Sequence, residues 1–249
     1  MKLAKAYAPS RSANSFRRLF TLRKTNGMNP ITWARRSIRR RGLLQTSKVA
    51  GSVARDFFFD WRYGTDTRRF VEVDDLDTES ENKSRAVHYQ ATKAWSFLKL
   101  LRAIQIPPDG TFVDIGSGKG RALMIAAHYG FKRSVGIEFS PQLCAIARKN
   151  VATFQKSSLL RSEIEVIEGD AALCPIESEM NVFYMYNPFD AVVLSRVLAN
   201  IGESVSKSPR KIWLIYNTPQ HHDVIDQSGL FAECSFREIG GTDFRIYSN

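Results

Sequence analysis

The chain has 249 residues, of which 43% are hydrophobic, and a formal net charge of +11. It is long enough for one large globular domain with an extension, and its apolar content is enough to build a core. No stretch approaches the roughly 18 to 20 apolar residues of a membrane span, and no charged segment followed by an apolar one resembles a secretory signal, so we expect a cytoplasmic protein that is neither transmembrane nor exported.

The positive charge is concentrated at the N-terminus. Residues 1–55 contain 14 Lys and Arg and no Asp or Glu, which leaves 22 basic and 25 acidic residues in 56–249. We interpret residues 1–55 as a basic, partly helical extension. Its apolar residues recur at loosely helical spacing beside arginines, so a helix could bury one face and expose the arginines. These apolar residues are Ile31, Trp33, Ile38, Leu43, Leu44, Val49 and Val53.

Two other interpretations of this basic arm stay open. Its charge would attract nucleic acid or an anionic membrane surface. An acid-free N-terminus with Arg and Ser is also typical of a mitochondrial targeting peptide, which would place the protein in mitochondria. Residues 1–28 are expected to be mobile.

Residues 56–93 form a second region with a different composition. An aromatic-rich segment, residues 57–67, precedes an acidic stretch from Glu72 to Glu81 that is too polar for a core. We predict that this region is a loop or lid rather than part of the main sheet.

Residues 94–249 alternate strands and helices, as a doubly wound α/β sheet requires. The last two strands are joined by Gly240-Gly241-Thr242, which is a hairpin turn signal. The predicted helices cover residues 94–101, 119–129, 141–154, 191–206 and 220–228. The predicted strands cover residues 111–115, 133–138, 163–168, 181–186, 211–216, 231–238 and 243–248.

The most specific signal is a buried strand that runs through a glycine-rich turn into a helix, residues 111–127. Glycines let the backbone approach a ligand closely, and the helix offers unpaired N–H groups to a carboxylate or phosphate. Arg121 stands where a dinucleotide-binding fingerprint needs glycine, and Val113 and Gly120 fail the phosphate-loop pattern. Asp114 in the turn is unfavourable for pyrophosphate but accepts hydrogen bonds from an ammonium group.

Two further acids end the next two predicted strands. Glu138 lies 22 residues after Gly116, near the ~20 expected for a carboxylate that binds ribose hydroxyls. Asp170 ends the third strand. All three acids lie at carboxyl ends of strands, where open sheets bind ligands.

The loop D-x-G-S-G-x-G resembles motif I of the class I (seven-strand, Rossmann-like) S-adenosylmethionine (SAM) methyltransferases. This resemblance implies a doubly wound seven-stranded Rossmann-like sheet with an antiparallel last strand, and SAM as cofactor. It also implies that the segment before the loop closes over SAM, so that Tyr89, Gln90 and Thr92 are candidates for contacts; Tyr89 could instead cap the core. The implied cofactor-binding residues are Asp114, Gly116, Ser117, Gly118, Gly120, Glu138, Phe139, Asp170, Ala171, Tyr89 and Asn187.

A polar and aromatic segment follows the fourth predicted strand, where the methyl acceptor should bind. Asn187-Pro188-Phe189 resembles the [DNS]-P-P-[YF] motif of amino methyltransferases, although it has one proline instead of two. It is also similar to the Asn-Asn-Phe of the non-SET histone lysine methyltransferases, which carry a similar loop. The resemblance implies catalytic roles for Asn187, Pro188 and Phe189, with Phe189 or Tyr186 walling a lysine stem. A plain strand-ending turn is the alternative.

The combined prediction is a SAM-dependent methyltransferase that acts on an amino nitrogen, with protein lysine slightly ahead of a nucleobase or a small molecule. The alternative is a noncatalytic subunit that binds SAM or nucleic acid. No metal is expected, because the cysteines and histidines have no metal-site spacing. Lys119 and Arg121 could hold an anionic acceptor or the SAM carboxylate, or could face solvent.

Overall fold

The computed structural model describes residues 30–68, 71, 85–87, 89–158 and 160–249. Contacts divide the chain into two units, Met1–Val49 and Ala50–Asn249. The expected mobility of residues 1–28 and the acidic stretch Glu72 to Glu81 lie outside the described residues.

The first unit contains helix α2, Pro30–Arg41, and the start of helix α3, Leu43–Tyr63. Gly42 joins them in the left-handed conformation, with φ of +80°. The helical extension is therefore confirmed. Within this unit the side chains of Ile38 and Leu43 are exposed. The other apolar side chains named above lie outside the description, so the predicted buried face stays a prediction.

The aromatic segment that begins at Phe57 was predicted as a loop, and this is wrong up to Tyr63, because α3 continues to that residue. Phe59 and Tyr63 are one helical turn apart and pack on each other, with ring centroids 5.1 Å apart. Tyr63 also packs on Phe154, at 4.8 Å. This aromatic face anchors the helix, which ends before Gly64 at φ of +70°.

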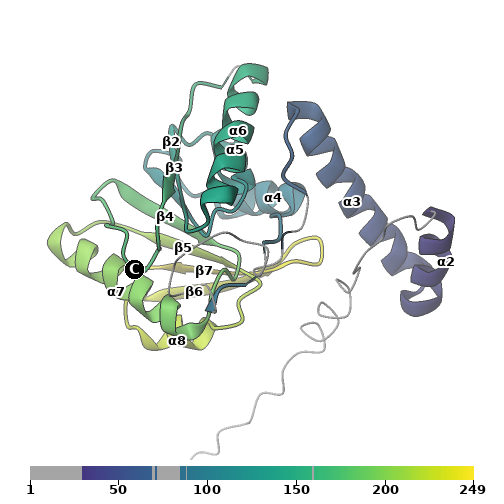
Figure 1. Ribbon diagram of the computed structural model, residues 1–249. Helices are drawn as coiled ribbons and strands as arrows, with labels where there is room; N and C mark the ends of the chain where they lie inside the picture. The colour runs from purple at the N-terminus through teal and green to yellow at the C-terminus, as the bar shows by residue number, and fades with distance from the viewer. Residues whose placement is uncertain (1–29, 69–70, 72–84, 88, 159) are drawn as a thin grey trace, which may run out of the picture. The chain divides into compact units, whose positions relative to one another are not determined.

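Seven strands form one sheet in the order β3-β2-β1-β4-β5-β7-β6. Strand β7 is antiparallel to both of its neighbours, whereas β1 to β5 are mutually parallel (Figure 1). The predicted fold class and the antiparallel last strand are confirmed. The strands are β1 Thr111–Ile115, β2 Arg133–Glu138, β3 Glu163–Glu168, β4 Met180–Met185, β5 Trp213–Asn217, β6 Glu233–Glu238 and β7 Asp243–Ser248.

Helices cover both faces of the sheet (Figure 1). On one face the core joins the strands to α4 (Ala94–Ile104), α5 (Arg121–Tyr129) and α6 (Pro141–Ser157). On the other it joins them to α7 (Ala191–Lys207) and α8 (His222–Gln227). Side chains alternate between the two faces along a strand, and strand β1 contributes to both cores in this way. Phe112 belongs to the first core, whereas Val113 and Ile115 belong to the second. The parallel strands are buried on both faces of the sheet. Because they run in the same direction, their carboxyl ends lie along one edge.

Candidate functional site

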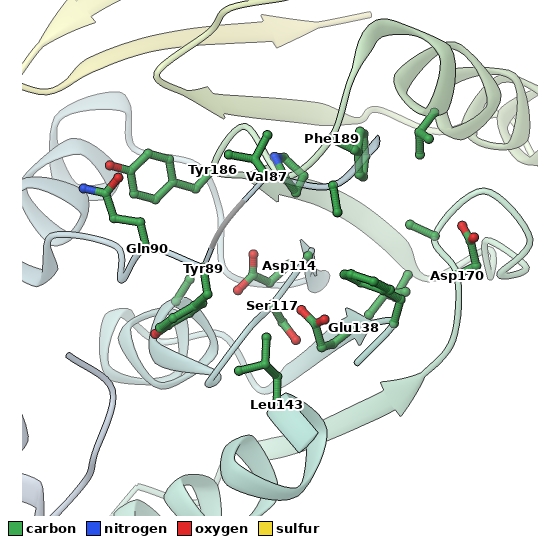
Figure 2. A pocket seen from close by; sticks show the side chains of 18 of the residues that line it. Val87, Tyr89, Gln90, Asp114, Ser117, Glu138, Leu143, Asp170, Tyr186 and Phe189 are labelled. Atoms are coloured by element: carbon green, nitrogen blue, oxygen red, sulfur yellow. The ribbon is translucent and has the colours of Figure 1, made fainter. Parts of the chain in front are cut away.

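A crevice lies at the carboxyl ends of β1 to β4 and is partly covered by the segment before α4. Figure 2 shows Asp114, Ser117 and Glu138 in its centre, with Tyr89 and Phe189 on different sides. Most predicted site residues therefore come together. Those that line the crevice are Tyr89, Gln90, Thr92, Asp114, Gly116, Ser117, Glu138, Phe139, Asp170, Ala171, Tyr186, Pro188 and Phe189.

Two glycines of the loop after β1 permit close contacts that no side chain would allow. A Cβ on Gly116 would lie 2.5 Å from Cβ of Pro188, and one on Gly118 would lie 2.2 Å from the ring of Tyr89. Both have positive φ, +76° and +54°. Gly118 therefore lies beneath Tyr89 and, like Gly120, is not among the residues that line the crevice.

The backbone N–H groups of this loop are already paired. Those of Gly116 and Ser117 donate to the carbonyl of Ile137, at 2.9 and 3.1 Å. That of Gly118 donates to Glu138 Oε2 at 2.8 Å. The loop thus folds back on β2 and uses these three N–H groups to fix its own shape.

Two buried carboxyl groups, Asp114 and Glu138, face the crevice, and each is 3% exposed. Burial raises the pKa of Glu138, against hydrogen bonds that lower it, including those from Ser140 and Gly118. The Ser140 N–H lies 3.0 Å from Glu138 Oε1, so both carboxylate oxygens are held. Burial and the neighbouring Glu138 raise the pKa of Asp114 well above its usual range. A ligand with a positive charge and hydroxyl groups would stabilise the ionised form of these two buried carboxyl groups.

Ser117 also lines the crevice. The Ser117 hydroxyl is buried and has no hydrogen-bond partner among the described residues. Such groups are costly unless a ligand or water satisfies them. On the third side Asp170 follows β3, and its Oδ1 accepts from the Ala172 N–H at 2.9 Å. These groups fit SAM, whose ammonium and hydroxyl groups match the acids.

The acceptor segment after β4 is divided between the crevice and the core. Tyr186, Pro188 and Phe189 line the crevice, but Asn187 does not. Asn187 is 5% exposed, has φ of +43°, and its Oδ1 accepts from the Tyr216 hydroxyl at 2.8 Å. The Pro188 carbonyl accepts from the Val87 N–H at 2.9 Å. The Asn187 side-chain oxygen and the Pro188 carbonyl thus each already accept one hydrogen bond.

Sequence reasoning missed Tyr216, which lies near the end of β5 and is 1% exposed. Burial raises its pKa to about 12, so at neutral pH the phenol keeps the proton that it donates to Asn187. A signal was available, because β4 and β5 are adjacent and parallel, and both residues follow or lie at carboxyl ends.

Lys119 and Arg121 are each only 2% exposed, so the alternative that they face solvent is wrong. Lys119 Nζ lies 5.5 Å from the ring centroid of Tyr89, in a cation–π arrangement. Arg121 forms ion pairs with Asp56 and Asp60. Both side chains turn inward because the segments before α4 cover them.

Over the residues that the structure describes, no cluster of three or more His, Cys, Asp or Glu side chains could hold a metal ion. No described helix is both long and apolar enough to cross a bilayer.

A family model described as "Histone methylation protein DOT1" matches residues 71–161. A histone-lysine N-methyltransferase, H3 lysine-79 specific, from Caenorhabditis elegans is 29% identical over an alignment of 136 residues, and the match covers 49% of this chain and 14% of that protein. This chain therefore spans only a small part of that relative.

Among solved structures, a SAM-dependent methyltransferase from Aquifex aeolicus superimposes with a TM-score of 0.50 and 14% identity, over 61% of this chain and 88% of that one. The pyocyanin biosynthetic protein PhzM also gives 0.50, with 15% identity over 62% and 54% of the two chains. These likenesses show the fold. The chain has the class I methyltransferase fold, and fold and family match together support a SAM-dependent methyltransferase domain with SAM as its cofactor.

Proposed function

We propose that the chain is a SAM-dependent methyltransferase that transfers a methyl group to an amino nitrogen, with protein lysine slightly favoured. The observation that carries the proposal is the meeting of the acid-bearing loops with the segment after β4, where Pro188 packs directly on Gly116. The cofactor side and the acceptor side of one crevice are thus adjacent. Bound SAM supplies an electrophilic methyl group, so the protein needs chiefly to orient the acceptor and keep its lone pair free.

The donor side has acids for the ammonium group, the ribose and the adenine of SAM. Asp114 would hold the ammonium group, and Ser117 offers a buried hydroxyl without a partner among the described residues. Glu138, fixed by two backbone N–H groups, would accept from the ribose hydroxyls. Asp170 would lie beside the adenine.

The acceptor side is largely apolar and aromatic. Tyr186 and Phe189 line it together with Val87 and Ala86, which suits the alkyl stem of a lysine. An apolar wall also disfavours the ammonium form of the amine and so favours the neutral, nucleophilic form. Asn187 Oδ1 and the Pro188 carbonyl each keep a second lone pair, with which they could orient an amine. The DOT1 family match supports lysine over a nucleobase.

One observation favours a second candidate, a noncatalytic subunit that binds SAM. Asn187 is tied to Tyr216 and lies outside the lining of the crevice. If that arrangement persists with an acceptor present, the chain would bind the cofactor without orienting an amine.

Two measurements separate these candidates. Titration calorimetry with S-adenosylhomocysteine tests the cofactor site, and transfer of tritiated methyl from SAM to a cell extract, followed by protease or nuclease digestion, identifies the acceptor. We expect binding and protease-sensitive label that hydrolyses to methyl-lysine. Binding without any labelled fraction would favour the noncatalytic subunit, and absence of binding would contradict both.

A matched pair of variants tests the acceptor segment. We expect Asn187→Ala to abolish transfer and leave S-adenosylhomocysteine affinity nearly intact. Asn249→Ala is the control, because the Asn249 amide bonds the Arg210 carbonyl and the Ile212 N–H, each at 2.9 Å, ahead of β5 and away from the residues that line the crevice. Full turnover by Asn187→Ala would show that the role assigned to the Asn-Pro-Phe segment is wrong.

A further inference from the structure

Arg121 is a charged side chain in the interior, only 1% of it exposed. A buried guanidinium is costly unless it is paired and hydrogen-bonded. Here Nη2 lies 3.1 Å from Asp60 Oδ2, and Nη1 lies 3.3 Å from Asp56 Oδ1. Both acids come from α3, far from Arg121 in sequence, so the pairs tie that helix to the start of α5.

The remaining donors of Arg121 are also used. Its Nε donates to Thr67 Oγ1, and Nη1 also reaches the Thr92 carbonyl at 3.3 Å. Phe59 covers the guanidinium, with 5.4 Å from Cζ to its ring centroid. With every nitrogen engaged and two carboxylates opposite, Arg121 is a poor site for an anionic ligand, although it borders the crevice.

Thr67 connects this cluster to Tyr89. It is fully buried, and its hydroxyl donates to Asp60 Oδ1 at 2.6 Å. Its carbonyl accepts from the Tyr89 hydroxyl at 2.7 Å. The ring of Tyr89 lies so close to Gly118 that a Cβ there would be 2.2 Å from it. Burial raises the pKa of Tyr89 far above its usual value, so its hydroxyl stays a donor.

We propose that Arg121 is a positioning residue that acts through Thr67 to hold Tyr89 on the loop after β1, and so fixes one wall of the crevice. The guanidinium fork is what the arrangement needs, because it spans Thr67, Asp60 and Asp56 at once. A lysine at this position keeps the charge but cannot make these bonds together. The effect on cofactor affinity rests on the proposed function, whereas the placement of Tyr89 does not.

The first test is a double-mutant cycle on the full chain, with S-adenosylhomocysteine affinity as the readout. We expect Arg121→Lys and Tyr89→Phe each to weaken binding by about tenfold, the size typical of coupled neighbours. If Arg121 acts through Tyr89, the double variant should bind no more weakly than the weaker single variant. Losses that multiply would show that Arg121 acts independently and would overturn the proposal.

The second test needs no ligand and compares two arginines of the chain. Hydrogen exchange of a peptide containing Tyr89 should be faster in Arg121→Lys, because the Tyr89 N–H that bonds the Val71 carbonyl at 3.0 Å would lose its support. Arg133→Lys is the matched control, since Arg133 also pairs with two carboxylates, Glu165 and Glu177, but at the opposite edge of the sheet. Equal exchange in both variants would overturn the proposal.

Failure of this proposal and failure of the proposed function are distinguishable. If the unmodified chain does not bind S-adenosylhomocysteine, the proposed function fails and hydrogen exchange alone decides the role of Arg121. If Arg121→Lys does not fold, Thr67→Val replaces it in both tests. That variant keeps the shape and the carbonyl of Thr67 and removes the hydroxyl, so we expect the same faster exchange near Tyr89, and unchanged exchange would overturn the proposal.

Discussion

Asp114 and Glu138 lie close together in the crevice (Figure 2), and their burial has a consequence for the pH dependence of binding. Burial first, and then the charge of Glu138, raise the pKa of Asp114 well above its usual range. Without ligand, this acid contributes stability at low pH that is lost as pH rises through the raised pKa. A ligand ammonium requires the ionised acid, so binding should release a proton.

We therefore expect S-adenosylhomocysteine affinity to rise as pH increases through the raised pKa of Asp114, below the titration of the ligand amine. Calorimetry in two buffers of different ionisation enthalpy measures the released proton. Glu138→Gln removes the neighbouring charge and should move the rise to lower pH, although it weakens binding. Affinity that falls with rising pH would contradict the role of Asp114.

Tyr216 carries the second prediction at this scale, because its hydroxyl fixes the orientation of the Asn187 amide. Tyr216→Phe should lower kcat by roughly tenfold, the loss expected for one orienting hydrogen bond, and leave S-adenosylhomocysteine affinity unchanged. Tyr129→Phe is the control, since its hydroxyl bonds the Ile106 carbonyl ahead of β1. An equal loss in both variants would indicate general destabilisation.

The N-cap of helix α7 is Asp190, which directly follows the crevice-lining residue Phe189. Asp190 accepts from the N–H groups of Val192 and Val193, at 3.0 and 3.1 Å, and pairs with Arg85 at 2.8 Å. The ion pair is largely exposed and contributes little. Asp190→Ala should lower the free energy of unfolding by about 1 kcal/mol, and Asp190→Asn, which keeps the cap, by well under that amount. Urea denaturation measures both; equal losses would show that the ion pair dominates.

The elements predicted correctly from the sequence have apolar residues on one side or along their whole length. Strands β1, β2, β3 and β7 have their predicted bounds, because each is a short apolar or alternating run between turn residues. The aromatic end of α3 was missed because Phe57, Phe58 and Trp61 are 52%, 58% and 67% exposed, which hides its buried face.

The sequence predicted those parts of the site that the order and direction of the strands bring together. The three acids and the Pro188-Phe189 segment meet because they follow parallel strands. The bonds of Asn187 to Tyr216 and of Arg121 to Asp60 join residues distant in sequence. They depend on side-chain directions after folding, which no local pattern of the chain carries.

On the scale of the whole molecule, the excess positive charge and the residues that line the crevice lie in different segments of the sequence. Residues 56–249 hold 22 basic and 25 acidic residues, so the excess positive charge belongs to residues 1–55. The crevice is lined by residues between Ala86 and Val193. We therefore expect deletion of residues 1–28 to leave S-adenosylhomocysteine affinity unchanged, as measured by calorimetry; a weakened affinity would mean that the arm contributes to the site.

The same deletion should change binding to nucleic acid, because counterion release depends on the number of cations that contact phosphates. We expect non-specific binding to weaken and the slope of log affinity against log salt concentration to become flatter, since the deletion removes seven of the 14 basic residues of the arm. A full-length variant with each Lys and Arg of residues 1–28 replaced by Gln separates charge from chain length. If that variant keeps the slope of the unmodified chain, the arm does not act through its charge, and the basic residues of 30–55 become the next segment to neutralise.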